Sequence, residues 1–177
     1  MNTVELRHHR NVDAVRQALL DVYADVYADQ DPFHSTARFD ERLGSHAARP
    51  GWEAVVAYDG DEPAGFAYAV PLGPGTAWWD HMITPLPEGY AIEDGRRTLA
   101  FNELMIRTAW RGQGLSQRLH DELLAQRDEQ RVTLLVDPGH PKVMDLYRTW
   151  GYEEIGRQQP FPDSPVFAAM TRPLRIG

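Results

Sequence analysis

A strand, a glycine-bearing loop, a helix and a second strand follow one another in the C-terminal half of the chain. The apolar stretch TLAFNELMI (98–106) predicts a strand, and RTAWRGQG (107–114) predicts a loop. The stretch SQRLHDELLAQR (116–127) has leucines at helical spacing, and RVTLLVD (131–137) is the continuous apolar run of a strand buried on both faces. Strands joined through a helix run parallel in one sheet. This order therefore predicts an α/β fold.

The loop places Gly112 and Gly114 directly before the helix, where glycine costs backbone entropy and offers no side chain. One explanation is a tight turn. The other is that glycines let backbone N–H groups approach a phosphate at the positive end of the helix. The segment contains neither the Gly-Lys-Ser/Thr of a P-loop nor the three spaced glycines of a dinucleotide fingerprint. These residues alone leave both explanations open.

The remaining periodicities predict helices before and after this unit and a β-hairpin ahead of it. We expect a first strand over 3–7, helices over 12–28 and 36–48, hairpin strands ending near Tyr58 and Leu72, a helix over 141–151 that stops at Gly151, and strands over 153–156 and 165–174. Asn11 is the expected cap of the first helix. The segment 71–97 is rich in Gly and Pro, and loops of this length are more often functional than idle.

Composition excludes several classes of protein. The chain has 177 residues and no cysteine, so disulfides, thiolate metal sites and cysteine nucleophiles are excluded, and its seven histidines show no metal-ligand spacing. The formal net charge of −8 argues against a nucleic-acid partner and favours a cationic small molecule. No apolar run approaches the ~20 residues of a membrane span, and the N-terminus has no apolar signal core. We expect no metal and no membrane, and a cytoplasmic location.

The loop RGQGLS (111–116) resembles the acyl-CoA pyrophosphate loop of the GNAT acetyltransferase superfamily, whose pattern is Gln/Arg-x-x-Gly-x-Gly/Ala. Ser116 departs from that pattern but is small. The stretch ELMI (103–106) ends the preceding strand as in the family, and HPKVMDLYRTWGY (140–152) resembles its second motif, NxxAxxLYxxxGF. The resemblance implies one domain over 1–177, with a mixed, mostly antiparallel sheet of six or seven strands flanked by helices. A parallel strand pair in that sheet should splay apart.

The resemblance also implies a cofactor site for acetyl-CoA. Backbone N–H groups from Gly112 to Gln117 would hold the pyrophosphate, Arg111 would pair with a phosphate, and strand backbone would bind the pantetheine arm. His140 stands where the family often has an Asn, so it would contact the cofactor, act as an alternative base or be a loop histidine. The expected cofactor-binding residues are Leu104, Met105, Ile106, Arg111, Gly112, Gln113, Gly114, Leu115, Ser116, Gln117 and His140.

Two residues are candidates for the chemistry. By the resemblance, Tyr147 would protonate the thiolate as it leaves; its alternative is a helix tyrosine that packs on the sheet. Glu103 would accept a proton from the acceptor, because a primary amine is mostly ammonium at pH 7. Strand alternation puts Glu103 on one face with Phe101 and Met105. Its alternative role is an ion pair with a nearby Arg.

Two parts of the chain offer candidate residues for the acceptor site. Trp78, Trp79 and Asp80 could hold a cationic substrate by cation–π contact and charge, or the two tryptophans could anchor their loop. His34 lies where the family often builds its acceptor site, or it is a surface histidine. The predicted function is direct, acetyl-CoA-dependent N-acetylation of a small-molecule amine. The alternatives are acetylation of a protein N-terminus or lysine, and a non-catalytic acyl-CoA-binding partner protein; a homodimer is left open.

Overall fold

The structure is a computed structural model that describes residues 3–27 and 32–174. Contacts divide the chain into two compact units, residues 1–70 with 102–127 and residues 71–101 with 128–177. The strand 98–106 passes from the second unit into the first. None of the described helices is long and apolar enough to cross a membrane.

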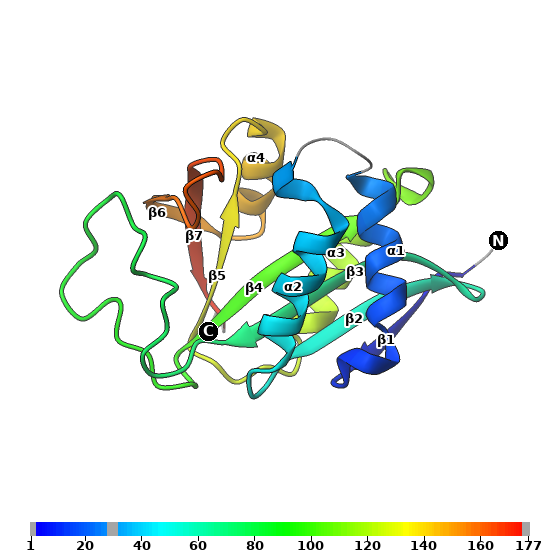
Figure 1. Cartoon of the computed structure of the whole chain (residues 1–177), viewed down its shortest axis with the longest axis horizontal. Helices are drawn as coiled ribbons and strands as arrows, with labels where there is room; N and C mark the ends of the chain where they lie inside the picture. Colours follow the sequence, from blue (N-terminus) through cyan, green and yellow to red (C-terminus); the bar gives the residue numbers. More distant parts are fainter. Residues whose placement is uncertain (1–2, 28–31, 175–177) are drawn as a thin grey trace. The chain divides into compact units, whose positions relative to one another are not determined.

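Seven strands and four α-helices make up the described chain (Figure 1). The first unit holds β1 (Glu5–His9), α1 (Arg16–Val26), α2 (Thr36–Ala47), β2 (Glu53–Asp59), β3 (Glu62–Pro71) and α3 (Leu115–Leu124), with 3-10 turns η1 (Val12–Ala14), η2 (Pro32–His34) and η3 (Thr108–Trp110). The second holds β5 (Arg131–Val136), α4 (Pro141–Thr149), β6 (Glu153–Gln158) and β7 (Phe167–Pro173). Strand β4 (Thr98–Ile106) belongs to both.

The strands form one mixed sheet in the order β1-β2-β3-β4-β5-β7-β6. Strands β4 and β5 are parallel, whereas β1–β2, β2–β3, β5–β7 and β6–β7 are antiparallel. This confirms the predicted fold class. The parallel register covers only residues 98–100 of β4 and 131–133 of β5, although both strands continue beyond it. The two strands are thus paired only over their first residues.

The core of the first unit follows from the alternation of its strands. Figure 1 shows α1 and α2 over one face of these strands and α3 over the other. Ala54 and Val56 of β2 face the buried side chains of α1 and α2, such as Leu19 and Phe39. Gly65 of β3 lies so close to β4 that a Cβ there would stand 2.6 Å from the carbonyl oxygen of Met105. A side chain at that position would push the two strands apart.

Several predicted boundaries need correction. The first strand is Glu5–His9 rather than 3–7. Asn11 caps the η1 turn, where its side chain accepts a hydrogen bond from the N–H of Asp13, and α1 begins only at Arg16. Helix α3 starts at Leu115 and ends at Leu124 rather than spanning 116–127. The predicted end of the first helix, Ala28, lies outside the described residues. Helix α4 stops as expected, with Gly151 at φ 94° after its C-cap.

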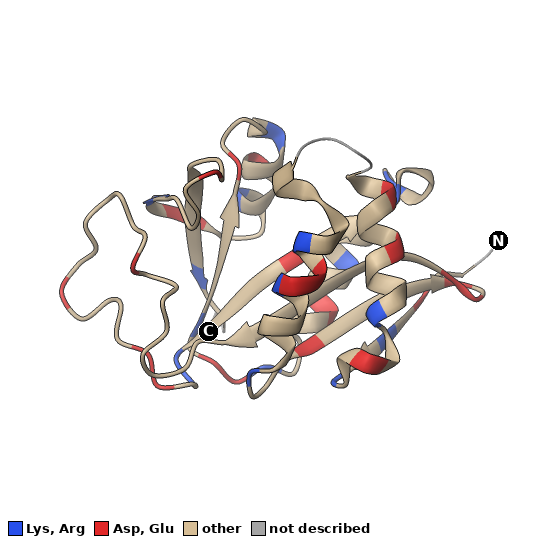
Figure 2. Cartoon of the chain, viewed as in Figure 1, with Lys and Arg blue, Asp and Glu red and all other residues tan. Residues whose placement is uncertain are grey.

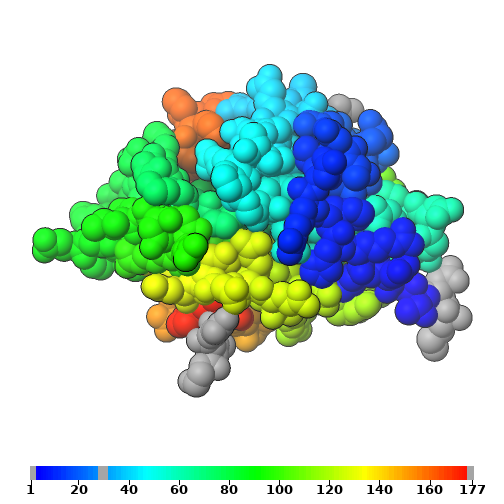
Figure 3. Space-filling view, turned by 90° about the horizontal axis from the view of Figure 1, so that it is seen from below, coloured from blue at the N-terminus to red at the C-terminus, as the bar shows by residue number. Residues whose placement is uncertain are grey.

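Residues 72–97 of the second unit form no helix and only one isolated bridge, between Met82 and Gln158, yet they are anchored. The indole N–H of Trp79, the hydroxyl of Thr98 and the guanidinium of Arg131 all donate to Oε2 of Glu93, at 2.9, 2.9 and 3.0 Å. The guanidinium also lies 4.0 Å from the centroid of the Tyr90 ring. The space-filling view shows the green residues of this segment packed together (Figure 3). A buried charge cluster thus holds the loop in addition to its few backbone hydrogen bonds, such as the one from the N–H of Ile83 to the carbonyl oxygen of Arg157.

Candidate active site

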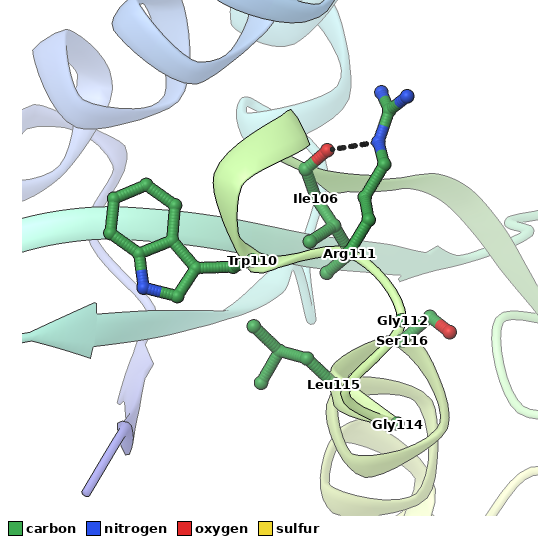
Figure 4. A pocket seen from close by; sticks show the side chains of 7 residues that line it. All are labelled: Ile106, Trp110, Arg111, Gly112, Gly114, Leu115 and Ser116. Carbon is green, nitrogen blue, oxygen red and sulfur yellow. Dashed lines mark hydrogen bonds between the residues drawn. The ribbon is translucent and has the colours of Figure 1, made fainter. Parts of the chain in front are cut away.

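A hollow lies at the N-terminus of α3, where the glycine loop leads from the end of β4 into the helix (Figure 4). It holds about 250 Å³ of space, part of it open to solvent. Apolar side chains and the glycine loop share its lining, which consists of Ile106, Trp110, Arg111, Gly112, Gly114, Leu115 and Ser116. Six of these seven residues belong to the predicted cofactor site. The sequence motif therefore folds into a concave surface.

The backbone of the loop explains its glycines. Gly112 has φ 78°, and Gly114, the N-cap of α3, has φ 74° and ψ 11°. This left-handed conformation costs a residue with a Cβ about 1–2 kcal/mol. Gly114 also offers no side chain to cap the helix, so the N–H groups of the first turn keep no intrahelical partner. The helix therefore presents unpaired donors and its positive end to the hollow, an arrangement suited to an anion.

Two side chains beside the loop are fixed by hydrogen bonds. Nε of Arg111 donates to the carbonyl oxygen of Ile106 at 3.0 Å, and Figure 4 shows the ends of its guanidinium pointing away from Gly112. The indole N–H of Trp110 donates to Oδ2 of Asp59 at 3.0 Å. Trp110 was not among the predicted site residues. The sequence feature that could have indicated it is the aromatic side chain immediately before the Arg-x-x-Gly pattern.

Glu103 of β4 is paired with Arg42 of α2. Nε and Nη2 of Arg42 donate to the same oxygen, Oε1, at 3.3 and 3.0 Å. The side chains of Arg42 and Glu103 are only 19% and 15% exposed. The ion pair that formed the alternative role of Glu103 is thus present. Helical spacing does not predict this partner, because Arg42 lies 61 positions before Glu103 in the sequence.

The surroundings of Glu103 raise its pKa above the ordinary value on balance. Burial raises the pKa of Glu103, while the charges of Arg42 and His34 lower it by a smaller amount. His34 stacks on Tyr27, with ring centroids 4.5 Å apart and planes inclined by 7°. Burial, together with the nearby Glu103 charge, raises the pKa of Tyr27 to about 12. A carboxylate with a raised pKa is better matched to accepting a proton near neutral pH.

The other predicted residues lie in the second unit. Tyr147 of α4 is half-buried, and its ring meets those of Trp150 and Tyr152 edge-on, at centroid distances of 5.4 and 5.7 Å. His140 is the N-cap of α4, and its side chain is 71% exposed. Trp78 is half-buried and Asp80 is exposed, whereas Trp79 is only 6% exposed. The roles expected for all of these residues stay predictions.

Potential metal ligands are dispersed over the described chain. Within residues 3–27 and 32–174, no group of three or more His, Asp or Glu side chains is placed to hold a metal ion.

The fold and the open helix N-terminus define an α/β protein suited to an anionic ligand, and the comparisons name its family. The model of the acetyltransferase (GNAT) family matches residues 13–152. The chain therefore belongs to the GNAT family, whose members transfer acetyl groups from acetyl-CoA. A comparison with curated proteins finds no match.

Solved structures share the fold over nearly the whole chain. An acetyltransferase from Thermus thermophilus is 17% identical with a TM-score of 0.61, covering 97% of each chain. The ribosomal-protein-alanine N-acetyltransferase from Brucella melitensis is 20% identical with a TM-score of 0.64, covering 96% of this chain and 99% of that one. The yncA protein from Salmonella typhimurium, solved with its cofactor acetyl-CoA, is 15% identical with a TM-score of 0.65, covering 99% and 96%. Identities this low show the fold alone.

Proposed function

We propose that this chain is an acetyl-CoA-dependent N-acetyltransferase that moves the acetyl group directly onto a primary amine of a small molecule. The observation that carries the proposal is the hollow at α3, where Gly112 and Gly114 leave backbone donors unpaired. Family membership supplies the acetyl donor, and yncA provides a neighbour that binds acetyl-CoA. The pyrophosphate would accept hydrogen bonds from the N–H groups between Gly112 and Gln117. The backbone of Leu104, Met105 and Ile106 would bind the pantetheine arm.

Glu103 is the proposed base. It would take a proton from the ammonium form of the acceptor, and the neutral amine would then attack the thioester carbonyl. The new N–C bond forms as the C–S bond breaks, and the thiolate takes a proton from Tyr147 or solvent. The chain contains no cysteine, so a cysteine acyl-enzyme cannot form, which agrees with direct transfer.

A small acceptor is favoured by the burial of Glu103. The side chain of Glu103 is 15% exposed, and its charge interacts with the stacked rings of Tyr27 and His34. A compact amine needs less space beside such a group than a polypeptide does. The Brucella melitensis neighbour is named a ribosomal-protein-alanine N-acetyltransferase. Acetylation of a protein by this chain would require the polypeptide to approach the same carboxylate.

The test is thiol release from acetyl-CoA across a panel of polyamines, aminoglycosides, amino acids and short peptides. The protein contributes no thiol of its own to the signal. Turnover with small amines and none with peptides supports the proposal. Turnover restricted to peptides replaces it with the protein-acetylating alternative. Calorimetric binding of acetyl-CoA without any turnover would favour a non-catalytic binding protein.

A further inference from the structure

Arg42 holds Glu103 in an unusual way, by one oxygen only. Nε and Nη2 of its guanidinium both donate to Oε1, and Oε2 takes part in neither contact. The two donors come from one planar group, so together they fix the position of Oε1. The pair leaves one oxygen of the carboxylate uncommitted to Arg42.

The guanidinium is itself held against aromatic rings. Its central carbon lies 5.4 Å from the ring centroid of Phe39 and 5.9 Å from that of Tyr23. Both rings belong to the apolar core between α1 and α2. Figure 2 shows basic and acidic residues interspersed along α2. The side chain of Arg42 is only 19% exposed, so its charge is largely removed from solvent. Rings and carboxylate together fix the position of this guanidinium.

We propose that Arg42 is a positioning residue for acetyl transfer: it fixes Glu103 through Oε1 so that Oε2 is left to accept the proton of the acceptor ammonium. The inference rests on the proposed function, in which Glu103 is the base. Oε2 takes one proton from the ammonium nitrogen, and the freed lone pair forms the N–C bond while the C–S bond breaks. The nitrogen loses a second proton as the amide forms, which balances the proton taken by the thiolate.

The charges around Glu103 give the inference a measurable consequence. Arg42 faces it from α2, His34 from η2, Tyr27 from the end of α1 and Tyr68 from β3. Burial raises the pKa of Glu103, and Arg42 opposes that rise more than His34 does. Glu103 acts as a base only when it is deprotonated. Removing the Arg42 charge should therefore move the acidic limb of the activity profile to higher pH.

The experiment measures the pH dependence of kcat/KM for the full chain, with acetyl-CoA and the best amine of the panel. In R42M we expect the acidic limb to move up by about one to three pH units, the range for a carboxylate that loses a neighbouring Arg. R42K keeps the positive charge but lacks the two-donor guanidinium. Its acidic limb should therefore return toward the wild-type position, while its plateau value of kcat/KM stays below that of the wild type. The control is R16M, because Arg16 pairs with Asp40 across the same two helices.

Three outcomes separate the possible failures. An acidic limb that stays in place in both R42M and E103Q means that the base lies elsewhere, and the proposed role of Glu103 falls as well. A limb that disappears in E103Q but does not move in R42M overturns the Arg42 inference alone. A limb that moves equally in R42M and R16M shows only a general effect of disturbing α1 and α2, and it too overturns the inference. R42M should bind acetyl-CoA as the wild type does, which shows that the variant is folded.

Discussion

Replacing Gly114 by alanine separates the two explanations of the glycine loop. A Cβ built on Gly114 meets nothing within 4 Å, so the substitution adds only the cost of a left-handed backbone at φ 74°. That cost is about 1–2 kcal/mol of unfolding free energy. Gly60, in the turn between β2 and β3, has φ 63° and equally open space around its Cβ. G60A is therefore a matched control, and urea denaturation should show similar destabilisation in both variants.

Only G114A should weaken the binding of acetyl-CoA. A methyl group at this N-cap would stand beside the N–H groups that are proposed to meet the pyrophosphate. Losing one hydrogen bond to a charged group costs about 1.5–3 kcal/mol. At 1.4 kcal/mol per tenfold, this corresponds to a Kd roughly 10- to 100-fold higher, measured by calorimetry. G60A should bind acetyl-CoA with the wild-type affinity.

A truncated donor provides the refuting result. Acetyl-pantetheine has no pyrophosphate, so kcat/KM with this donor should be the same in G114A as in G60A. If G114A and G60A bind acetyl-CoA equally well, or if G114A loses as much activity with acetyl-pantetheine as with acetyl-CoA, the glycines serve only to make the turn.

Three further predictions concern the scaffold and are measured by chemical denaturation. G65A should lose about 1–3 kcal/mol of unfolding free energy, because its Cβ would stand 2.6 Å from the carbonyl oxygen of Met105. E93A should lose about 3–5 kcal/mol, since it leaves the buried Arg131 charge without its partner. Burial lowers the pKa of His46 to about 3, so the unfolded chain takes up that proton first and stability falls as the pH drops. Between pH 7 and pH 5, His46 should lower the unfolding free energy of the wild type by about 2 kcal/mol, and H46Q should not show this part of the decrease.

The first two of these have a matched control in the chain. G73A places a Cβ in open space, so a loss in G65A no greater than in G73A would refute the close approach of β3 and β4. Arg148 and Asp145 form an exposed pair at 2.9 Å, and R148A should cost under about 1 kcal/mol. An equal effect of E93A would mean that the loop anchor contributes little. An unchanged pH slope in H46Q would assign the acid sensitivity to other groups.

The sequence predicted what depends on local pattern. Alternation and helical spacing located the strands and helices, and the parallel connection followed from the order of 98–137. The glycine loop was located by its motif and folds into a hollow. Side-chain pairings across the chain were beyond such patterns. Arg42 pairs with Glu103 although 61 positions separate them in the sequence. Apolar spacing predicts a helix from residue 12, but α1 begins only at Arg16, so Asn11 caps a 3-10 turn.

Backbone and side chains divide the proposed reaction between them. In that proposal the donor end would be built from N–H groups whose positions depend on Gly114, whereas the acceptor end would depend on the charges of Arg42 and Glu103. G114A should therefore change the KM for acetyl-CoA and leave the acidic limb in place, while R42M should do the opposite. Because the two positions act on different partners, their effects on kcat/KM should multiply in the double variant. A departure from this product at one pH would show that binding of the donor changes how Glu103 is held, a coupling that neither single variant reveals.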